Sequence, residues 1–154
     1  MDLSDLIEAS AILPALKANS KKQLLQLLSE KAAAITGLPE REVFDTILQR
    51  ERLGSTGVGN GIAIPHGKLP GVKRITGVFA RLDSPVDFEA LDDQPVDLVF
   101  LLLAPEGAGA DHLKALSRIA RVLRDGDTVA KIRGTRDPAA IHALLSETPT
   151  SHAA

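Results

Sequence analysis

The sequence contains no cysteine, tryptophan or tyrosine, and only four of its 154 residues are phenylalanine. The absence of cysteine excludes disulfides, thiolate metal sites and thiol catalysis. With so few aromatic side chains, leucine, isoleucine, valine and alanine must fill the core. The longest apolar run, residues 98–104, is too short to cross a bilayer, and the first residues lack the pattern of a signal peptide. We therefore expect a soluble, cytoplasmic protein without membrane insertion.

The chain also lacks a dominant charge. Its 18 Lys and Arg residues against 20 Asp and Glu residues give a net charge of −2 without a basic stripe, so nucleic acid is not expected as a partner. A hydrophobic fraction of 44% and a charged fraction of 25% suffice for a sizeable core and exclude intrinsic disorder. The length corresponds to one domain, since domains hold roughly 100–200 residues, and no repeat or linker divides the sequence.

Two helices are predicted in the first third of the chain. One begins at Ser20, because Ser20 and Gln23 have the spacing of a capping box and apolar residues then recur at helical intervals until Gly37. A second helix should cover residues 39–53, with Pro39 in its first turn, and end at Gly54.

Three segments are typical of strands. Residues 75–82 alternate between apolar and polar side chains and should be half exposed, whereas residues 96–103 are continuously apolar and should be buried on both faces. Residues 12–16 could form a short strand, but Pro14 restricts it to an edge of a sheet. Residues 3–7 could make a helical turn.

Helices should follow these strands. A strongly amphipathic helix is predicted after Asp111 as its N-cap, with an inner face made of Leu113, Leu116, Ala120 and Leu123. A short helix over residues 127–133 and a last one over residues 137–145 complete the pattern. The order of elements predicts a single-domain α/β sandwich with a mixed sheet, covering residues 1–147 and followed by a frayed tail at residues 148–154.

A cluster of glycines at positions 54, 57, 59, 61 and 67 is the most unusual stretch of the sequence. The spacing Gly-x-Gly-x-Gly, following a helix, differs from the dinucleotide-binding pattern Gly-x-Gly-x-x-Gly that follows a strand. A Walker loop is also excluded, because Ile62 stands where its first glycine is needed and Leu69 where its Ser or Thr is needed. The cluster therefore fits neither common nucleotide-binding motif.

His66 stands between Pro65 and Gly67, directly after the strand-like segment 62–64. Proline stiffens the approach, and glycine allows another backbone to come close without a Cβ atom in the way. This setting suits an imidazole presented to a docking partner near neutral pH. A histidine kept in a turn for its hydrogen bonds is the alternative, and both interpretations stay open at this point.

His112 should lie in the first turn of a helix, where free N–H groups and the helix dipole favour anions and disfavour an imidazolium. A neutral imidazole there could donate a hydrogen bond to a developing negative charge, although an ordinary exposed histidine is the alternative. His142 and His152 have no such setting, and we expect both at the surface.

Arg50 follows Val43 and Ile47 at helical intervals, so its stem should continue the apolar face while Arg52 points elsewhere. Its guanidinium could clamp a phosphoryl group or pair with a carboxylate such as that of Asp97.

Residues 50–68 read RERLGSTGVGNGIAIPHGK, and this run resembles the phosphoacceptor region of IIA proteins. These proteins form the fructose/mannitol-type branch of the bacterial phosphoenolpyruvate-dependent phosphotransferase system. The resemblance continues through residues 93–98 and 112–117, covers nearly the whole chain, and is strongest to the nitrogen-regulatory members of the family.

The resemblance implies a five-stranded mixed sheet flanked by helices, and it implies roles for individual residues. His66 matches the phosphorylated histidine, His112 the second active-site histidine and Arg50 the active-site arginine, and Gly67 and Lys68 fall in the phosphate-binding loop. The implied donor is a small histidine-phosphorylated carrier protein, and the transfer needs neither a metal ion nor a cofactor.

Three functions remain as alternatives. The resemblance favours a regulatory switch, with potassium-transport regulators or sensor kinases as partners. A sugar-specific IIA component that passes the phosphoryl group to a IIB protein has a similar motif. A metal-dependent hydrolase that uses His66 and His112 is disfavoured, because neither residue has the carboxylate cluster or His-x-x-x-His spacing of such a site.

Overall fold

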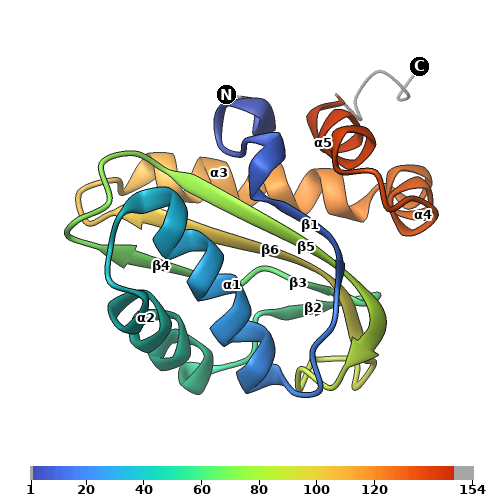
Figure 1. Cartoon of the computed structure of the whole chain (residues 1–154), viewed down its shortest axis with the longest axis horizontal. Helices are drawn as coiled ribbons and strands as arrows, with labels where there is room; N and C mark the ends of the chain where they lie inside the picture. Colours follow the sequence, from blue (N-terminus) through green and yellow to red (C-terminus); the bar gives the residue numbers. More distant parts are fainter. Residues whose placement is uncertain (1, 148–154) are drawn as a thin grey trace.

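A mixed six-stranded sheet forms the middle layer of the protein (Figure 1). The structure is a computed structural model and describes residues 2–147. The strands are β1 (Ile12–Leu16), β2 (Gly57–Gly59), β3 (Ile62–Ala63), β4 (His66–Leu69), β5 (Thr76–Val86) and β6 (Val96–Pro105). The helices are α1 (Lys21–Thr36), α2 (Glu40–Leu53), α3 (Ala110–Arg124), α4 (Gly126–Arg133) and α5 (Pro138–Ser146). Two 3₁₀ turns, Leu3–Asp5 and Ala9–Ala11, precede β1.

Strand β6 lies at the centre of the sheet. It pairs with β5 in the antiparallel direction and with β3 and β4 in the parallel direction. Ile62 lies opposite Leu98 and His66 opposite Leu102, so β3 and β4 keep one register and are two parts of one strand. The break falls at Pro65, which has no N–H group to donate to a ladder. The predicted mixed sheet is confirmed, and this break raises the number of strands from five to six.

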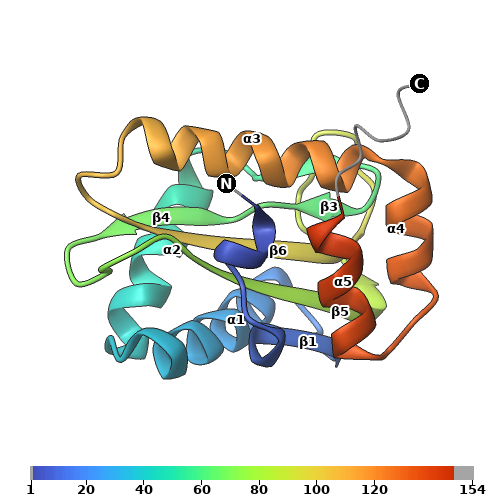
Figure 2. The same cartoon turned by 90° about the horizontal axis from the view of Figure 1, so that it is seen from above.

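Helices cover both faces of the sheet (Figure 2). On one side α1 and α2 pack against Val99, Leu101 and Leu103 of β6. On the other side α3, α4, α5 and the N-terminal turns pack against the alternate side chains of the same strand, Leu98, Phe100 and Leu102. Both faces of β6 are therefore buried, as its continuous apolar sequence predicts.

Local signals place most helix ends as predicted. The Ser20 hydroxyl accepts a hydrogen bond from the Gln23 N–H at 3.1 Å, and Gly37 ends α1 in the left-handed conformation with φ of 78°. Helix α2 begins directly after Pro39 and ends before Gly54. Asp137 caps α5 through the N–H group of Ala139. The edge position predicted for the strand that contains Pro14 is also confirmed.

The predicted burial of the strand at residues 75–82 was wrong. Strand β5 runs from Thr76 to Val86 and is mostly buried, because helices cover both faces of the sheet here. Its apolar-polar alternation therefore does not mark a solvent-exposed face.

The predicted start of α3 was wrong as well, and its inner face was predicted only in part. The N-cap is Gly109 rather than Asp111, and the buried face consists of His112, Ala115, Ile119, Val122 and Leu123. Of the predicted face, Leu123 is buried, and Leu116 and Ala120 are half-buried against the core, but Leu113 is 67% exposed. Apolar residues recur at helical spacing on both of these faces, so periodicity alone does not select the one that meets the sheet.

His142 and His152 were both predicted to lie at the surface. His142 is half-buried rather than at the surface, and its Nε2–H group donates to the carbonyl oxygen of Ile7 at 2.9 Å, which ties α5 to the N-terminal turn. His152 and the predicted frayed tail at residues 148–154 lie outside the described residues.

Within residues 2–147 no helix has both the length and the apolar character needed to cross a membrane.

Candidate functional site

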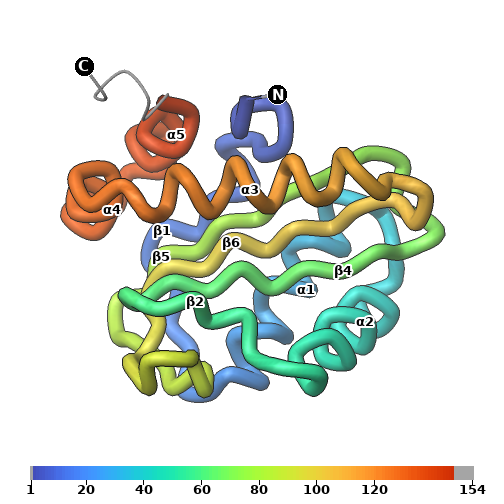
Figure 3. Tube along the Cα trace, turned by 180° about the vertical axis from the view of Figure 1, so that it is seen from behind, coloured from blue at the N-terminus to red at the C-terminus, as the bar shows by residue number. Residues whose placement is uncertain are grey.

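His66 opens β4 at the open edge of the sheet, with α2 and α3 in the layers on either side (Figure 3). Its side chain lies against α3, where its ring centroid is 5.6 Å from that of His112. Gly67 faces α2, and a Cβ atom there would stand 2.9 Å from Cγ2 of Thr46 and 3.3 Å from Cδ1 of Ile47. The predicted need for a close approach is confirmed, although side chains of α2 rather than a backbone make it. The loop implied for Gly67 and Lys68 is instead part of strand β4, together with His66.

A hydrogen bond fixes the orientation of the half-buried His66 ring. Its Nδ1 atom lies 2.8 Å from the carbonyl oxygen of Ile64. A carbonyl oxygen only accepts hydrogen bonds, so Nδ1 carries the proton of the neutral ring and Nε2 keeps a free lone pair. His66 is thus both a histidine held by a hydrogen bond and one with a nucleophilic nitrogen available.

His112 occupies the third position of α3 and is only 7% exposed, so the alternative of an exposed histidine was wrong. Its ring meets the His66 ring edge-on, with an angle of 67° between the planes. Among the described residues its buried Nε2 atom has no hydrogen-bond partner. A buried polar group without a partner costs about 1–3 kcal/mol, so a ligand oxygen next to His66 would find a donor here at little further cost.

Arg50 lies in the last turn of α2, and its Nη1 atom donates to the carbonyl oxygen of Gly54 at 3.0 Å. The predicted alternative, a pair with Asp97, was wrong, because Asp97 pairs with Arg133 at 2.9 Å. No ion pair within residues 2–147 involves Arg50. Since a guanidinium carries five N–H groups in a planar fork, Arg50 retains donors for an anionic ligand.

A cavity of about 600 Å³ brings all five predicted site residues together. It is lined by Thr46, Gln49, Arg50, Arg52, Leu53, His66, Gly67, Lys68 and His112. Arg52 was predicted to point elsewhere, but the cavity lies at the C-terminal end of α2, where successive residues surround it. The lining contains three cationic side chains and no carboxylate, so the cavity suits an anion.

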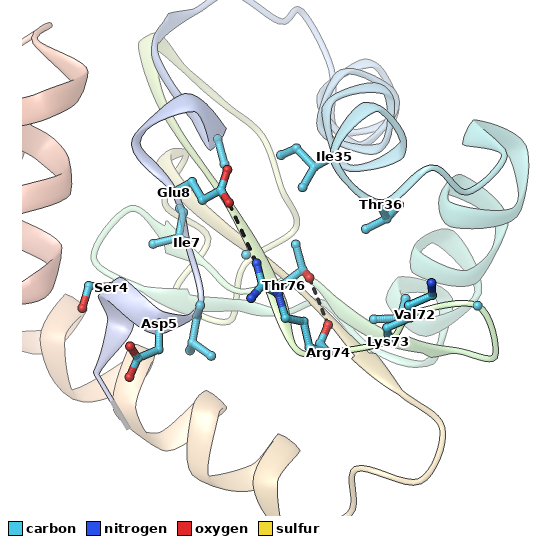
Figure 4. Close-up of a pocket in the computed structure, with 14 residues that line it drawn as sticks. Ser4, Asp5, Ile7, Glu8, Ile35, Thr36, Val72, Lys73, Arg74 and Thr76 are labelled. Carbon is cyan, nitrogen blue, oxygen red and sulfur yellow. Dashed lines mark hydrogen bonds and ion pairs between the residues drawn. The ribbon is translucent and has the colours of Figure 1, made fainter.

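A second cavity, of about 640 Å³, lies between the N-terminal turns, the end of α1 and the segment 71–77 (Figure 4). None of the predicted site residues lines it. Its exposed Arg74 lies 3.9 Å from Glu8, so a carboxylate already partly balances the cation. The lining of the cavity at His66 therefore suits an anion better than the lining of this second cavity does.

The imidazoles of His66 and His112 both favour the neutral form. Burial lowers the pKa of His66 below its ordinary value, and the positive charge of Arg50 lowers it further, whereas the hydrogen bond to Ile64 and the charge of Glu51 raise it. Burial also lowers the pKa of His112, and His66 and Lys68 act in the same direction. At neutral pH the site therefore contains two neutral rings beside three cations.

This lowered pKa predicts the pH dependence of any reaction in which Nε2 of His66 is the nucleophile. Protonation removes the lone pair, so the rate should be constant at high pH and fall only below the pKa of His66. A histidine with the ordinary pKa of about 6.5 would lose half of its rate at that pH. We expect this protein to lose less than half of its rate at that pH. Initial rates measured across the pH range, together with an NMR titration of His66, check this expectation. An apparent pKa of 6.5 or higher would contradict the prediction.

A buried polar cluster behind the site was not predicted. Glu51 in the last turn of α2 accepts hydrogen bonds from Thr56 and pairs with Lys21 of α1 at 3.1 Å. The sequence contained one signal for it, because the negative end of a helix dipole disfavours a carboxylate unless it has partners.

Within residues 2–147 no group of three or more His, Asp or Glu side chains could hold a metal ion.

The sequence was compared with known families and proteins. Residues 5–148 match the family model described as phosphoenolpyruvate-dependent sugar phosphotransferase system, EIIA 2. A nitrogen regulatory protein of Bradyrhizobium diazoefficiens is 63% identical over 153 residues, which make up 99% of this chain and 100% of that protein.

Solved structures agree with this match. The nitrogen regulatory protein IIA-Ntr of Neisseria meningitidis is 36% identical with a TM-score of 0.89, over 93% of this chain and 98% of that one. The mannitol IIA protein of Escherichia coli is 25% identical with a TM-score of 0.76, over 90% of this chain and 97% of that one. In a complex with phosphorylated IIB, the same mannitol protein shares the fold, with a TM-score of 0.77, 24% identity and coverage of 91% and 98%.

Proposed function

Because the chain belongs to the EIIA 2 family of the phosphoenolpyruvate-dependent phosphotransferase system, we propose that it is a phosphocarrier that accepts a phosphoryl group on His66. The donor in this proposal is a histidine-phosphorylated carrier protein, in keeping with a family whose members exchange phosphoryl groups with partners of the same system. One observation supports it most directly: His66, whose Nδ1 atom is engaged by Ile64 and whose Nε2 atom is free, lines a cavity with three cations and no carboxylate.

The transfer exchanges one phosphorus–nitrogen bond for another. The lone pair on Nε2 of His66 attacks the phosphorus atom in line with the departing imidazole of the donor, whose bond to phosphorus breaks. Arg50 and Lys68 would offset the charge on the equatorial oxygens, and Nε2–H of His112 would donate to one of them. Because the broken and formed bonds are of one kind, the step is close to balanced and reversible.

The phosphoryl group would act as a regulatory switch, with potassium-transport regulators or sensor kinases as partners that distinguish the two forms. The likeness to nitrogen regulatory proteins supports this role. Phosphorylation adds about −1.5 to −2 charges by analogy with other phosphoresidues. The added charge would lie in the cavity that the exposed side chain of Leu53 (85%) also lines, where it would disfavour a partner that docks on apolar surface.

A sugar-specific IIA component is the second candidate, and the likeness to the mannitol protein favours it. In that case the phosphoryl group would pass to a IIB protein and then to a sugar. The two functions share His66 and the donor, and they differ in what receives the phosphoryl group.

Partner capture from cell extract separates these two functions. We expect wild type, His66→Ala and His66→Glu proteins to retain different sets of partners, because the glutamate carries a negative charge where the phosphoryl group would be. A parallel assay should find no phosphoryl transfer to a sugar. Identical partner sets for all three proteins, together with transfer through a IIB protein to a sugar, would leave the transport function standing.

A further inference from the structure

We propose that Glu51, Thr56 and Lys21 form a clamp that positions both His66 and Arg50 for phosphoryl transfer. This inference rests on the proposed function and assigns a role to buried residues that the transfer itself does not use. None of the three lines the cavity at His66, so they are positioning residues that act through others.

The clamp is built around a buried carboxylate. The Glu51 side chain is only 2% exposed, and its Oε1 atom accepts from the N–H of Thr56 at 3.1 Å and lies 3.1 Å from the ammonium of Lys21. Its Oε2 atom accepts from the hydroxyl of Thr56. The Lys21 ammonium lies 4.6 Å from the centre of the Phe88 ring. Burial of a carboxylate is tolerated only with such partners, so Thr56 is held through its backbone and its side chain at once.

One chain of hydrogen bonds leads from this clamp to His66. The carbonyl oxygen of Thr56 accepts from the N–H of Ile64 at 3.0 Å. The carbonyl oxygen of Ile64 in turn accepts from Nδ1–H of His66 at 2.8 Å. A displacement of Thr56 would therefore move the group that sets the tautomer of His66 and leaves Nε2 unprotonated.

A second chain leads to Arg50. Gly54 lies two residues before Thr56, and its carbonyl oxygen accepts from Nη1 of Arg50 at 3.0 Å. The Gly54 N–H donates to the backbone carbonyl of Glu51 at 3.1 Å. The segment 54–56 is thus attached to α2 at its start by a backbone bond and at its end by the Glu51 carboxylate, and it carries the acceptor that orients the guanidinium.

Two variants test the clamp, and two others are their controls. Thr56→Val removes the hydroxyl and keeps the shape, whereas Glu51→Gln removes the charge. Asp97→Asn weakens the partly buried ion pair with Arg133, whose guanidinium also donates to the carbonyl oxygen of Asn60. This is a structural contact of a similar kind, but neither Asp97 nor Arg133 lines the cavity at His66. Thr56→Ser, which keeps the hydroxyl, should retain the wild-type rate. All variants are checked for folding by circular dichroism.

In Thr56→Val and Glu51→Gln we expect the rate constant of phosphoryl transfer at saturating donor to fall about 10- to 100-fold, since a misplacement of about 1 Å can cost about 100-fold. The donor concentration for half-saturation should stay unchanged, because the buried clamp does not touch the docking surface. NMR of the imidazole nitrogens should show a population of His66 protonated on Nε2. Glu51→Gln should also lower the pKa of His66, since the charge of Glu51 raises it.

The control decides between positioning and simple destabilisation. Asp97→Asn should match wild type in rate, tautomer and pKa of His66. The clamp is overturned if folded Thr56→Val and Glu51→Gln proteins match wild type in rate and tautomer, or if Asp97→Asn shows the same losses. Failure of the proposed function is a separate result, because wild type would then accept no phosphoryl group, while the tautomer of His66 would still report on the clamp.

Discussion

Replacing His66 with alanine should abolish the acid-labile phosphoprotein that forms when the protein is incubated with a histidine-phosphorylated carrier. The expected effect is complete, because among residues 2–147 only His66 combines a place in the lining of the cationic cavity with a hydrogen bond that leaves its other ring nitrogen unprotonated. His112 also lines the cavity, but it is 7% exposed and lies behind the His66 ring in the first turn of α3. The measurement is the radiolabel that remains on the protein after separation at alkaline pH.

His142→Ala is the matched control for this result. His142 is also half-buried and also donates to a backbone carbonyl, but it lies on α5 and lines neither cavity. We expect this variant to be labelled like wild type. Label on His66→Ala at the wild-type level would show that another residue is the phosphoacceptor.

Helix ends and the order of elements could be predicted because they depend on neighbouring residues. The Ser20 cap, the left-handed Gly37 and the Asp137 cap are each set by contacts within four residues along the chain. The continuous apolar sequence of β6 was similarly sufficient to predict burial on both faces.

Features that depend on the packing of distant segments could not be predicted in the same way. The sequence of α3 offers two apolar stripes, and the sheet selects the one with Ala115 and Ile119, which leaves Leu113 exposed. This choice also decides the position of His112, since the selected stripe is the one that buries it beside His66. The burial of His112 could therefore not be predicted from the sequence, because it depends on which face of α3 meets the sheet.

The candidate site likewise contains residues that the sequence identified and residues that it did not. His66, His112, Arg50, Gly67 and Lys68 were identified from the motif, and the structure brings them to one cavity. Arg52 and the Glu51 cluster were missed because their surroundings come from the end of α2 and from the start of α1, thirty residues apart along the chain. Helical periodicity predicts which residues share a face, but not which partner that face meets.

Arg50→Ala should slow phosphoryl transfer by about 100- to 1,000-fold, because loss of one preorganised electrostatic contact to a charged transition state costs about that much. The guanidinium has no carboxylate partner among the described residues, and its bond to Gly54 holds it at the cavity. His112→Ala should slow the reaction less, since it removes one neutral donor, and should leave His66 able to accept the phosphoryl group. Rapid-quench measurement of the transfer from a phosphorylated carrier compares the two variants.

A second effect of Arg50→Ala distinguishes lost charge from lost structure. The positive charge of Arg50 lowers the pKa of His66, so its removal should raise that pKa and start the acidic loss of rate at a higher pH than in wild type. Arg41→Ala is the control, because Arg41 lies on the same helix but is exposed and pairs only with Asp45 at 3.9 Å. It should change neither the rate nor the pH profile.

Arg50→Lys should recover the pH profile but only part of the rate, since an ammonium keeps the charge and loses the planar fork that binds phosphoryl oxygens. Wild-type rates in both Arg50→Ala and His112→Ala would show that this cavity is not where the transfer occurs.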